Sequence, residues 1–315
     1  MNTQIAQLKK ELGKAVIGQE AMIEGLLVGL LCDGHILVEG VPGLAKTTTI
    51  NALSRAIGLD FKRIQFTPDL LPSDIIGAQI YNPQEHSFSI KKGPLFTNLL
   101  LADEINRAPA KVQSALLEVM QERQVTIAEE TFKLSSPFLV MATQNPIEQE
   151  GVYALPEAQL DRFMMKIVVH HNSEEEELEI MRKGAGKDFG EVTQVIEKEM
   201  ISSLQKAVQD IHMDSELEQY IVQLISATRK PEKFGLEKIA EDIMYGVSPR
   251  ASIDLYKAAK AKAFLRGNDF VSPADIGYMV HNVLRHRIVL SYEARAKGMT
   301  TDEIISTIVE TLPIP

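Results

Sequence analysis

The spacing of apolar residues changes from helical to strand-like within the first sixty residues. One face of a helix is marked by five apolar residues, Ile23, Leu26, Leu27, Leu30 and Leu31. The run from His35 to Glu39 then predicts a short buried strand that ends at Gly40. A second helix is predicted from Lys46 to Ile57, because its apolar residues recur every three to four positions and Gly58 follows. The predicted order is therefore strand, glycine loop, helix.

Further apolar runs predict an α/β fold. Strands are expected at residues 61–66, 99–102, 138–143 and 165–169, with a helix at 106–122 between two of them. Such alternation is typical of a parallel sheet flanked by helices. Residues 124–127 and 131–134 alternate around a loop of Ala128, Glu129 and Glu130, which predicts a hairpin projecting from the core.

Strand patterns stop near residue 201, and helix-start signals replace them. Ser248-Pro249 and Ser272-Pro273 each read as a helix cap followed by a first-turn proline, and Thr300 to Glu303 reads as a capping box. We therefore expect an α/β core at residues 1–200 and a smaller all-α domain at 201–315. The glycine-rich and lysine-rich stretch from Gly184 to Gly190 would suit a linker.

Composition narrows the class of protein. A net charge of −10 argues against broad nucleic-acid binding. The chain has no apolar stretch long enough to span a membrane and no secretory signal at its start, so we expect a cytoplasmic protein. Its single cysteine, Cys32, lies in an apolar helical row and is expected to be a buried structural thiol. The acidic run from Glu174 to Glu177 is interpreted as the solvated first turn of a helix.

The loop from Gly40 to Thr47 has the length and composition of a phosphate-binding P-loop. In such a loop, backbone N–H groups and a helix N-terminus surround a phosphate, the lysine reaches the β- and γ-phosphates, and the hydroxyl that follows binds Mg²⁺. Lys46 and Thr47 occupy those two positions. Ala45 stands where the usual pattern has glycine, so we expect a right-handed helical backbone there.

Two acids follow the apolar strand that begins at Leu99. A buried parallel strand would deliver Asp103 and Glu104 to the sheet edge beside the P-loop, where Asp103 would hold the Mg²⁺ shell and Glu104 would polarise the attacking water. Asn145 ends another apolar strand with an uncharged amide that can bind water and the γ-phosphate. Asn145 before Pro146 could instead be only a turn former, but its place after the P-loop and the acid pair favours function.

The order of these motifs resembles an AAA+ ATPase of the MoxR family over nearly the whole chain. The resemblance is carried by the following segments: Val16 to Glu20, Gly40 to Thr47, Asp103 to Pro109, Asn145, Leu155 to Phe163, and Ser248 to Ala251. The MoxR P-loop resembles Gly-x-Pro-Gly-x-Ala-Lys-Thr, so Ala45 fits. ATPase subunits of metal chelatases are near relatives.

The resemblance implies an AAA+ core, an all-α lid and a set of site residues. It implies ATP and Mg²⁺ as cofactors, with Lys46, Thr47, Asp103 and Glu104 as Walker residues and Asn145 as sensor 1. The expected nucleotide-binding residues are Val16, Ile17, Gly18, Gly40, Val41, Pro42, Gly43, Leu44, Ala45, Lys46, Thr47, Thr48 and Asp103, and the adenine would lie against 16–19. The resemblance also marks about 72–94 as a helix-2 insert and about 124–134 as a pre-sensor-1 hairpin.

Two arginines match residues that complete AAA+ sites. Arg162 resembles the arginine finger that reaches a neighbouring subunit's γ-phosphate, and an internal ion pair with Asp161 or Glu157 is the alternative. Arg250 resembles sensor 2, acting in its own subunit or a neighbour's. Arg107 is either a further interface residue or an ordinary helix-start arginine.

The resemblance implies a homo-oligomer, a hexameric ring, that remodels, assembles or activates a protein complex. A von Willebrand factor A-domain client and metal-cofactor insertion are implied possibilities. The rival hypotheses are a metal-chelatase ATPase subunit, a nucleic-acid motor and a non-hydrolysing scaffold. The hairpins of a nucleic-acid motor should carry more basic residues than Lys91, Lys92 and Lys133.

Several side chains are expected to be structural. His35, His170, His171 and His212 lack partners at metal-binding spacing. His281 and His286, beside Arg285 and Arg287, form a modest basic helix face that could meet acidic groups of a partner, and a solvated face is the default interpretation. For Phe88 and Ile90, hairpin packing and client contact are both open.

Overall fold

The computed structural model describes residues 2–84, 86–146, 153–186 and 189–315. The chain forms two compact units, each treated separately below. The first unit comprises Thr3–Leu155 and Ile167–Ser202, and the second comprises Pro156–Lys166 and Ser203–Pro315. The short segment Pro156–Lys166 thus groups with the later residues, which a single boundary at residue 200 does not anticipate.

A five-stranded parallel sheet is the centre of the first unit, in the order β2-β5-β8-β1-β9. Its strands are β1 (Ile36–Glu39), β2 (Phe61–Gln65), β5 (Leu99–Asp103), β8 (Leu139–Gln144) and β9 (Met165–Val168). The three central strands are buried except at their last residues and, apart from Thr143 and those last residues, they are apolar, as expected for strands covered on both faces. The predicted α/β class with a parallel sheet is confirmed.

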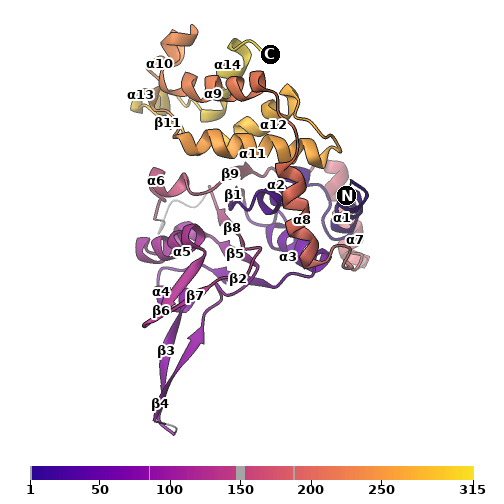
Figure 1. The fold of residues 1–315 in the computed structure, drawn as a ribbon, viewed down its shortest axis with the longest axis vertical. Coiled ribbons are helices and arrows are strands. Elements are labelled where there is room, and N and C mark those ends of the chain that lie inside the picture. Colours follow the sequence, from indigo (N-terminus) through magenta and orange to yellow (C-terminus); the bar gives the residue numbers. More distant parts are fainter. Residues whose placement is uncertain (1, 85, 147–152, 187–188) are drawn as a thin grey trace. The chain divides into compact units, whose positions relative to one another are not determined.

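The direction of each crossover decides which face its helix covers. The chain moves from β1 to β2 in one direction along the sheet and from β5 to β8 in the other. Because such crossovers are right-handed, their helices lie on opposite faces. Figure 1 shows α3 (Lys46–Ala56) on one side of the strands and α5 (Ala110–Glu122) on the other. The helix α2 (Glu20–Leu31) packs on β1 and β8.

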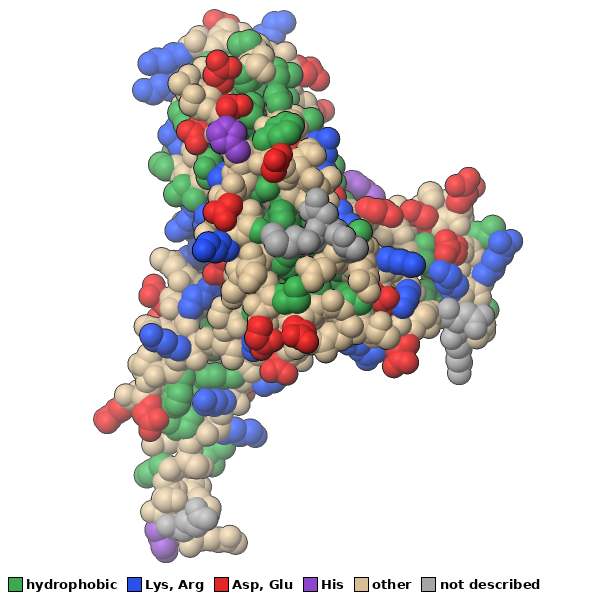
Figure 2. Space-filling view, turned by 45° about the vertical axis from the view of Figure 1, so that its right-hand side comes forward, with side chains coloured by type: hydrophobic (Ala, Val, Ile, Leu, Met, Phe, Trp, Pro, Cys, Tyr) green, Lys and Arg blue, Asp and Glu red, His purple; other side chains and the backbone are tan. Residues whose placement is uncertain are grey.

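Two hairpins interrupt this core. The longer one, β3 (Gly77–Asn82) with β4 (Ser87–Lys92), follows the short helix α4 (Pro72–Ile76), and the shorter one pairs β6 (Gln124–Ile127) with β7 (Glu130–Lys133). In the space-filling view, hydrophobic and basic side chains lie together over the part of the unit that holds these hairpins (Figure 2). The turn of the shorter hairpin contains only Ala128 and Glu129, because Glu130 pairs with Ile127.

The remaining elements of the first unit are helical. They are α1 (Asn2–Ala15), the short 3₁₀ turn η1 (Ile105–Arg107) and α7 (Glu174–Gly186). The helix predicted at 106–122 begins only at Ala110, since Pro109 takes the cap position after the 3₁₀ turn. The predicted linker overlaps the end of α7, and residues 187–188 within it lie outside the described residues.

The second unit is mainly helical. Its elements are α6 (Glu157–Leu160), α9 (Ser215–Arg229), η2 (Pro231–Phe234), α10 (Glu237–Ala240), β10 (Ile243–Tyr245), α11 (Pro249–Leu265), α12 (Pro273–Leu284), β11 (Val289–Leu290), α13 (Tyr292–Ala296) and α14 (Thr301–Thr311). The helix α8 (Lys198–Gln209) carries the chain from the first unit into the second. Ser248 and Ser272 open α11 and α12, each followed by proline, and a capping box at Thr300 opens α14, as predicted. Ser272 also forms a capping box with Asp275, which was not predicted from the sequence.

Two expectations about buried side chains have different outcomes. His35 is buried, where its Nδ1 accepts from the Val140 N–H and its Nε2 lies 3.0 Å from the Met120 carbonyl. Burial lowers the pKa of His35 to about 3, so its role is structural. Cys32 was expected to be buried and is only half-buried, because it caps the end of α2 rather than lying within the apolar face. Among the described residues, no helix is long and apolar enough to cross a bilayer.

Candidate nucleotide site

The loop from Gly40 to Thr47 connects β1 to α3 with an unusual backbone. Gly43 has φ 87° and Ala45 has φ 54° with ψ 19°, so both are left-handed. The right-handed conformation expected for Ala45 is therefore wrong. A left-handed methyl-bearing residue costs about 1–2 kcal/mol, which indicates that the surrounding loop enforces the turn into α3. The Lys46 ammonium donates to the Gly40 carbonyl at 2.6 Å, across the loop.

The two acids after β5 lie at the same edge of the sheet as this loop. The Thr143 hydroxyl on β8 donates to Asp103 Oδ1 at 2.7 Å and accepts from the Glu104 N–H at 2.9 Å. A single buried hydroxyl therefore positions both acids. Asp103 is 14% exposed and Glu104 is 22% exposed, so each carboxylate keeps an opening toward solvent.

Three residues hold the other carboxylate oxygens. Arg63 donates to Asp103 Oδ2 through Nε at 3.1 Å and Nη2 at 2.6 Å. Gln65 Nε2 donates to Glu104 Oε2 at 2.6 Å, and Arg107 Nε lies 3.2 Å from the same oxygen. Burial lowers the pKa of Lys46, while the charges of Asp103 and Glu104 oppose that change. The negative charges of Asp103 and Glu104 are thus opposed by the positive charges of Arg63, Arg107 and Lys46.

Three of the seven non-glycine residues with positive φ in the described part of the chain lie in the segments of this site. Gln19, Ala45 and Glu104 are non-glycine residues with φ between 54° and 62°. Each lies in a segment that the sequence assigned to nucleotide binding or hydrolysis. Left-handed non-glycine residues persist only where neighbouring structure holds them, and such residues gather at functional sites. Gly18, with φ 66°, lies so close to Asn172 that a Cβ there would collide with its side chain.

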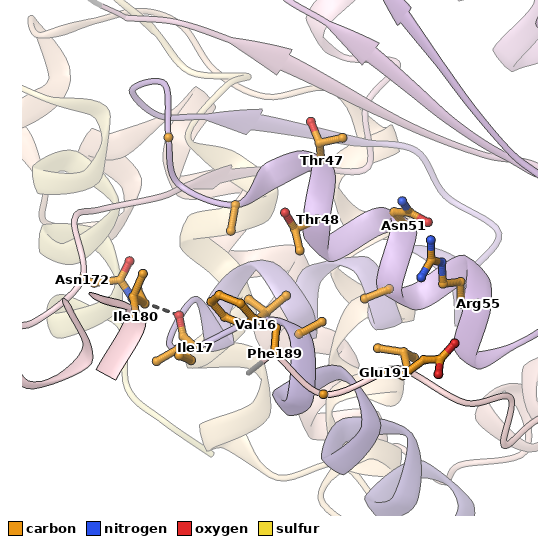
Figure 3. A pocket seen from close by; sticks show the side chains of 16 residues that line it. Val16, Ile17, Thr47, Thr48, Asn51, Arg55, Asn172, Ile180, Phe189 and Glu191 are labelled. Carbon is orange, nitrogen blue, oxygen red and sulfur yellow. Dashed lines mark hydrogen bonds between the residues drawn. The ribbon is translucent and has the colours of Figure 1, made fainter. Parts of the chain in front are cut away.

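Two cavities meet at the P-loop. One, of about 380 Å³, is lined by the loop, Asp103, Glu104, Asn145, Arg63 and Gln65. The other, of about 640 Å³, is drawn in Figure 3 and is lined partly by Val16, Ile17, Thr48, Asn51, Arg55, Asn172, Ile180, Phe189 and Glu191. Gly43, Ala45, Thr47 and Thr48 line both. A phosphate chain and a nucleoside would therefore share one loop, and the larger volume is typical of a small-molecule site.

Most predicted binding residues line these cavities. Val16 and Ile17 lie in the larger one, Asn145 lies in the smaller one, and Pro42 to Thr48 line one or both. Gly40 and Val41 instead line a separate hollow of about 450 Å³ with His170 and His171. Gly18 lines none of these three, and it contributes through its close approach to Asn172.

Sequence reasoning missed several residues of the site. Arg63 and Gln65 are two residues apart on β2, the edge strand. Polar residues are common on edge strands, and no motif marks these two. Asn172, whose Nδ2 donates to the Ile17 carbonyl at 3.0 Å, follows β9 and could have been found. The reasoning that placed Asp103 and Asn145 after parallel strands applies to it equally.

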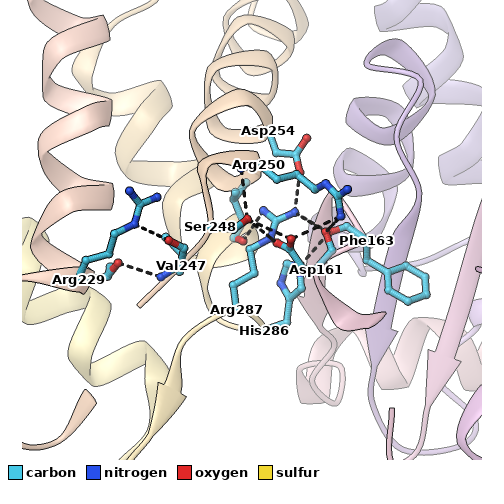
Figure 4. Close-up of polar contacts among 11 residues, drawn as sticks. Asp161, Phe163, Arg229, Val247, Ser248, Arg250, Asp254, His286 and Arg287 are labelled. Atoms are coloured by element: carbon cyan, nitrogen blue, oxygen red, sulfur yellow. Dashed lines mark hydrogen bonds and ion pairs between the residues drawn. The ribbon is translucent and has the colours of Figure 1, made fainter. Parts of the chain in front are cut away.

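Arg162 and Arg250 belong to the second unit and are described within it. Arg162 is half-buried. Its neighbour Asp161 accepts from the Ser248 hydroxyl at 3.0 Å, pairs with Arg250 Nη1 at 3.4 Å and pairs with Arg287 Nε at 2.8 Å (Figure 4). Asp161 is thus the centre of an ion-pair cluster.

The solvated basic face predicted around His286 is wrong for His286 and Arg287, and the Arg285 side chain is only 13% exposed. Arg287 is 1% exposed and pairs with Asp161 and Asp254, while His286 is buried with Nε2 donating to the Phe163 carbonyl at 2.9 Å. Both follow α12 on a turn that folds back into the unit, so helical periodicity does not apply to them. Burial first, and then the charge of Arg287, hold the pKa of His286 well below its ordinary value.

The residues of the first unit fit a magnesium nucleotide. Thr47 and Asp103 supply a hydroxyl and a carboxylate, the hard oxygen donors that Mg²⁺ prefers alongside water and phosphate. Lys46 supplies a charge for phosphate, and the start of α3 supplies backbone N–H groups. The arrangement is that of a P-loop nucleoside-triphosphatase.

Comparison with known proteins narrows this class. Residues 35–165 match the ATPase family associated with various cellular activities (AAA), and residues 237–308 match an AAA lid domain. The chain is 48% identical to Chaperone MoxR1 of Mycobacterium tuberculosis over 97% of its length and 81% of that relative. It is 33% identical to Protein MoxR of Paracoccus denitrificans, covering 96% of this chain and 94% of the relative.

A solved structure of an inferred ATPase from Cytophaga hutchinsonii is 51% identical, with a TM-score of 0.94 over 100% of this chain and 96% of that one. A more distant match, 25% identical over 79% of this chain and 55% of the relative, is the magnesium-chelatase subunit ChlI-1 of Arabidopsis thaliana. The protein is an AAA+ ATPase that binds nucleotide and hydrolyses ATP. Within that class, it belongs to the MoxR family of chaperone-like ATPases.

Proposed function

We propose that this ATPase acts as a homo-oligomeric ring, hexameric by family resemblance, that uses Mg²⁺-dependent ATP hydrolysis to remodel, assemble or activate a protein complex. The observation that carries the catalytic part is the joined cavity in which the P-loop faces Asp103 and Glu104. The remodelling part rests on similarity to Chaperone MoxR1. The cytoplasm is the location that we infer from the sequence.

Each polar group of the cavity has a distinct proposed task. Lys46 binds the β- and γ-phosphates, Thr47 and Asp103 hold Mg²⁺, and Asn145 binds the γ-phosphate or the attacking water. Bound Mg²⁺ would neutralise charge that develops on the phosphate oxygens. Asn145 is 7% exposed, so its amide is held in place and adds no charge near the phosphates.

Glu104 is proposed to orient and polarise the water. Its backbone is pinned by Thr143, and its Oε2 is held by Gln65 and Arg107. These contacts restrict the rotamers of the carboxylate, which is what a water-positioning group requires. Arg107 is thereby interpreted as a support for Glu104 as well as a candidate interface residue.

Arg162 is proposed as the arginine finger for a neighbouring subunit and Arg250 as sensor 2. A delocalised cation stabilises charge on the transferred phosphoryl group, and supplying it from another subunit links turnover to assembly. Arg250 is 44% exposed at its pair with Asp161, so a phosphate could take it from that partner at low cost.

The proposed client follows from the family resemblance. A von Willebrand factor A-domain protein is our proposed partner, and metal-cofactor insertion is a proposed outcome. The β3–β4 hairpin offers exposed apolar side chains, among them Phe88, which is 64% exposed and lies 5.1 Å from the Tyr81 ring centroid. We propose it as a contact for the client.

The similarity to ChlI-1 supports a second candidate, an ATPase subunit of a metal chelatase. Co-purification with a chelatase complex would favour it. A nucleic-acid motor has less support, since the chain carries a net charge of −10. A non-hydrolysing scaffold is set aside because the family hydrolyses ATP.

The decisive experiment measures ATP turnover against protein concentration, with mass by light scattering, for wild type, Glu104→Gln and Arg162→Ala. We expect turnover per subunit to rise as the protein assembles. Glu104→Gln should lose at least about 100-fold in turnover while still binding ATP, and Arg162→Ala should lose about 1,000-fold. Arg295→Ala, an exposed arginine of the same unit, is the matched control and should keep its turnover.

The ring mechanism is wrong if the protein is a monomer, its turnover per subunit does not depend on protein concentration, and Arg162→Ala is as active as wild type. The protein would then be a P-loop ATPase that works without a ring. Full activity of Glu104→Gln would remove the assignment of the catalytic acid.

A further inference from the structure

Arg63 reaches the catalytic edge from a strand that carries none of the expected motifs. It lies on β2, the edge strand beside β5, in a register that pairs Arg63 with Leu101 and Gln65 with Asp103. Because side chains alternate along a strand, Arg63 and Gln65 share one face and Lys62 lies on the other. Arg63 and Gln65 both line the phosphate cavity with the P-loop.

Both oxygens of Asp103 are engaged by groups of this chain. Oδ1 accepts from the Thr143 hydroxyl at 2.7 Å, while Oδ2 receives two N–H donors of Arg63, at 2.6 and 3.1 Å. Asp103 is also the carboxylate that we propose for Mg²⁺. A Mg²⁺ shell would draw on the same carboxylate as the guanidinium, and the two donors of Arg63 leave less acceptor capacity and less negative charge for a second cation.

We propose that Arg63 is an internal counter-ion that competes with Mg²⁺ for Asp103 and so sets the magnesium concentration at which nucleotide binds tightly. The proposal rests on the proposed Mg²⁺ role of Asp103. Exchange of one cation for another keeps this partly buried carboxylate neutralised at every stage, which avoids an uncompensated charge in the site. Arg63 thereby acts on binding through Asp103 and is a positioning residue.

The exposure of the pair makes such an exchange feasible. The Arg63 side chain is 48% exposed, whereas Asp103 is 14% exposed, so the arginine can leave toward water while the acid stays in place. Its Nη2 also donates to Gln65 Oε1 at 2.8 Å, which gives the guanidinium a partner when it leaves Asp103. Because its arginine is exposed, the pair contributes little stability, and Arg63 can yield Asp103 to a divalent ion at low cost.

The test is a magnesium titration of nucleotide binding, read by the anisotropy of a fluorescent, non-hydrolysable ATP analogue. Binding is measured in EDTA and then at rising Mg²⁺ for wild type, Arg63→Gln, Arg63→Lys and Lys62→Gln. Arg63→Gln should lower the Mg²⁺ concentration at half-saturation by about twofold to fivefold, the worth of an exposed pair. Arg63→Lys, which keeps the charge but loses the two-donor fork, should lie between Arg63→Gln and wild type.

Lys62→Gln removes an exposed cation from the opposite face of the same strand and should match wild type. The proposal is overturned if Arg63→Gln needs the same Mg²⁺ concentration as wild type for half-saturation, or a higher one. The nucleotide site is supported in either case if wild type binds the analogue tightly and in a Mg²⁺-dependent way. Absence of nucleotide binding by wild type would instead overturn the site itself. If Arg63→Gln does not fold, as judged by circular dichroism, the comparison of Arg63→Lys with wild type decides.

Discussion

The two units each contain an aspartate paired with arginine, but the two arginines differ in burial. Asp103 in the first unit is bound by Arg63, which is 48% exposed. Asp161 in the second unit is bound by Arg287, which is 1% exposed and also pairs with Asp254 at 2.5 Å. Arg63 can therefore move from its aspartate into water, whereas Arg287 cannot.

This difference separates a replaceable contact from a permanent one. An exposed ion pair contributes little to folding and can yield its carboxylate to a ligand. A buried arginine between two carboxylates cannot leave without stranding charge, so it fixes the packing around it. Arg287 additionally donates to the Phe163 carbonyl at 2.9 Å, which ties the segment after α6 to the turn after α12 within the second unit.

The largest expected effect is on stability, from Arg287→Ala. Its removal leaves Asp161 and Asp254 without their buried counter-ion, and we expect a loss of about 3–5 kcal/mol in the free energy of unfolding. Arg63→Gln should change that free energy by no more than about 1 kcal/mol. Chemical denaturation of both variants, with Arg295→Ala as an exposed control in the same unit, measures the contrast. Equal losses of unfolding free energy in Arg287→Ala and Arg63→Gln would show that the burial of the arginine does not decide the worth of the pair.

An intermediate effect is expected from acid, because His286 is buried and lies beside Arg287. Its pKa in the folded protein lies well below the ordinary 6.5, so the unfolded chain takes up a proton first as pH falls. Stability contributed by neutral His286 is therefore complete above about pH 6.5 and declines below it, by up to about 1.4 kcal/mol per pH unit.

Denaturation midpoints at pH 7 and pH 5 test this for wild type and His286→Gln. The variant should lose less stability between the two pH values than wild type does. His212→Gln, whose side chain is 69% exposed in the same unit, should keep the wild-type dependence. An identical pH dependence in wild type and His286→Gln would show that this histidine is not the acid-sensitive group.

The smallest expected effect is a gain, from Ala45→Gly in the P-loop. Ala45 has φ 54°, where glycine has no steric cost, so the substitution should stabilise the first unit by about 0.5–1 kcal/mol. A shift in thermal midpoint of a few degrees measures it. Ala52→Gly, in the right-handed interior of α3, is the control and should destabilise. Destabilisation by Ala45→Gly would mean that the loop does not enforce the left-handed turn.

Much of the first unit could be predicted because its signals are local. Apolar runs located all five strands of the parallel sheet within about two residues, and the acids after β5 lie at the predicted edge beside the P-loop. These predictions succeed because a buried parallel strand must be continuously apolar, and its first polar residues emerge at the sheet edge. Boundaries failed where proline acted, as at Pro109.

The fold class, the family and the P-loop with its acids follow from the sequence alone, since each depends on residues close together in the chain. Only the tertiary structure revealed that Arg63 binds Asp103 from 40 residues away and that Arg287 is buried against Asp161. The sequence does not distinguish an arginine on a solvated surface from one in a replaceable ion pair or in a buried cluster. Its surroundings, assembled from distant segments, decide the cost of moving its charge and hence its role.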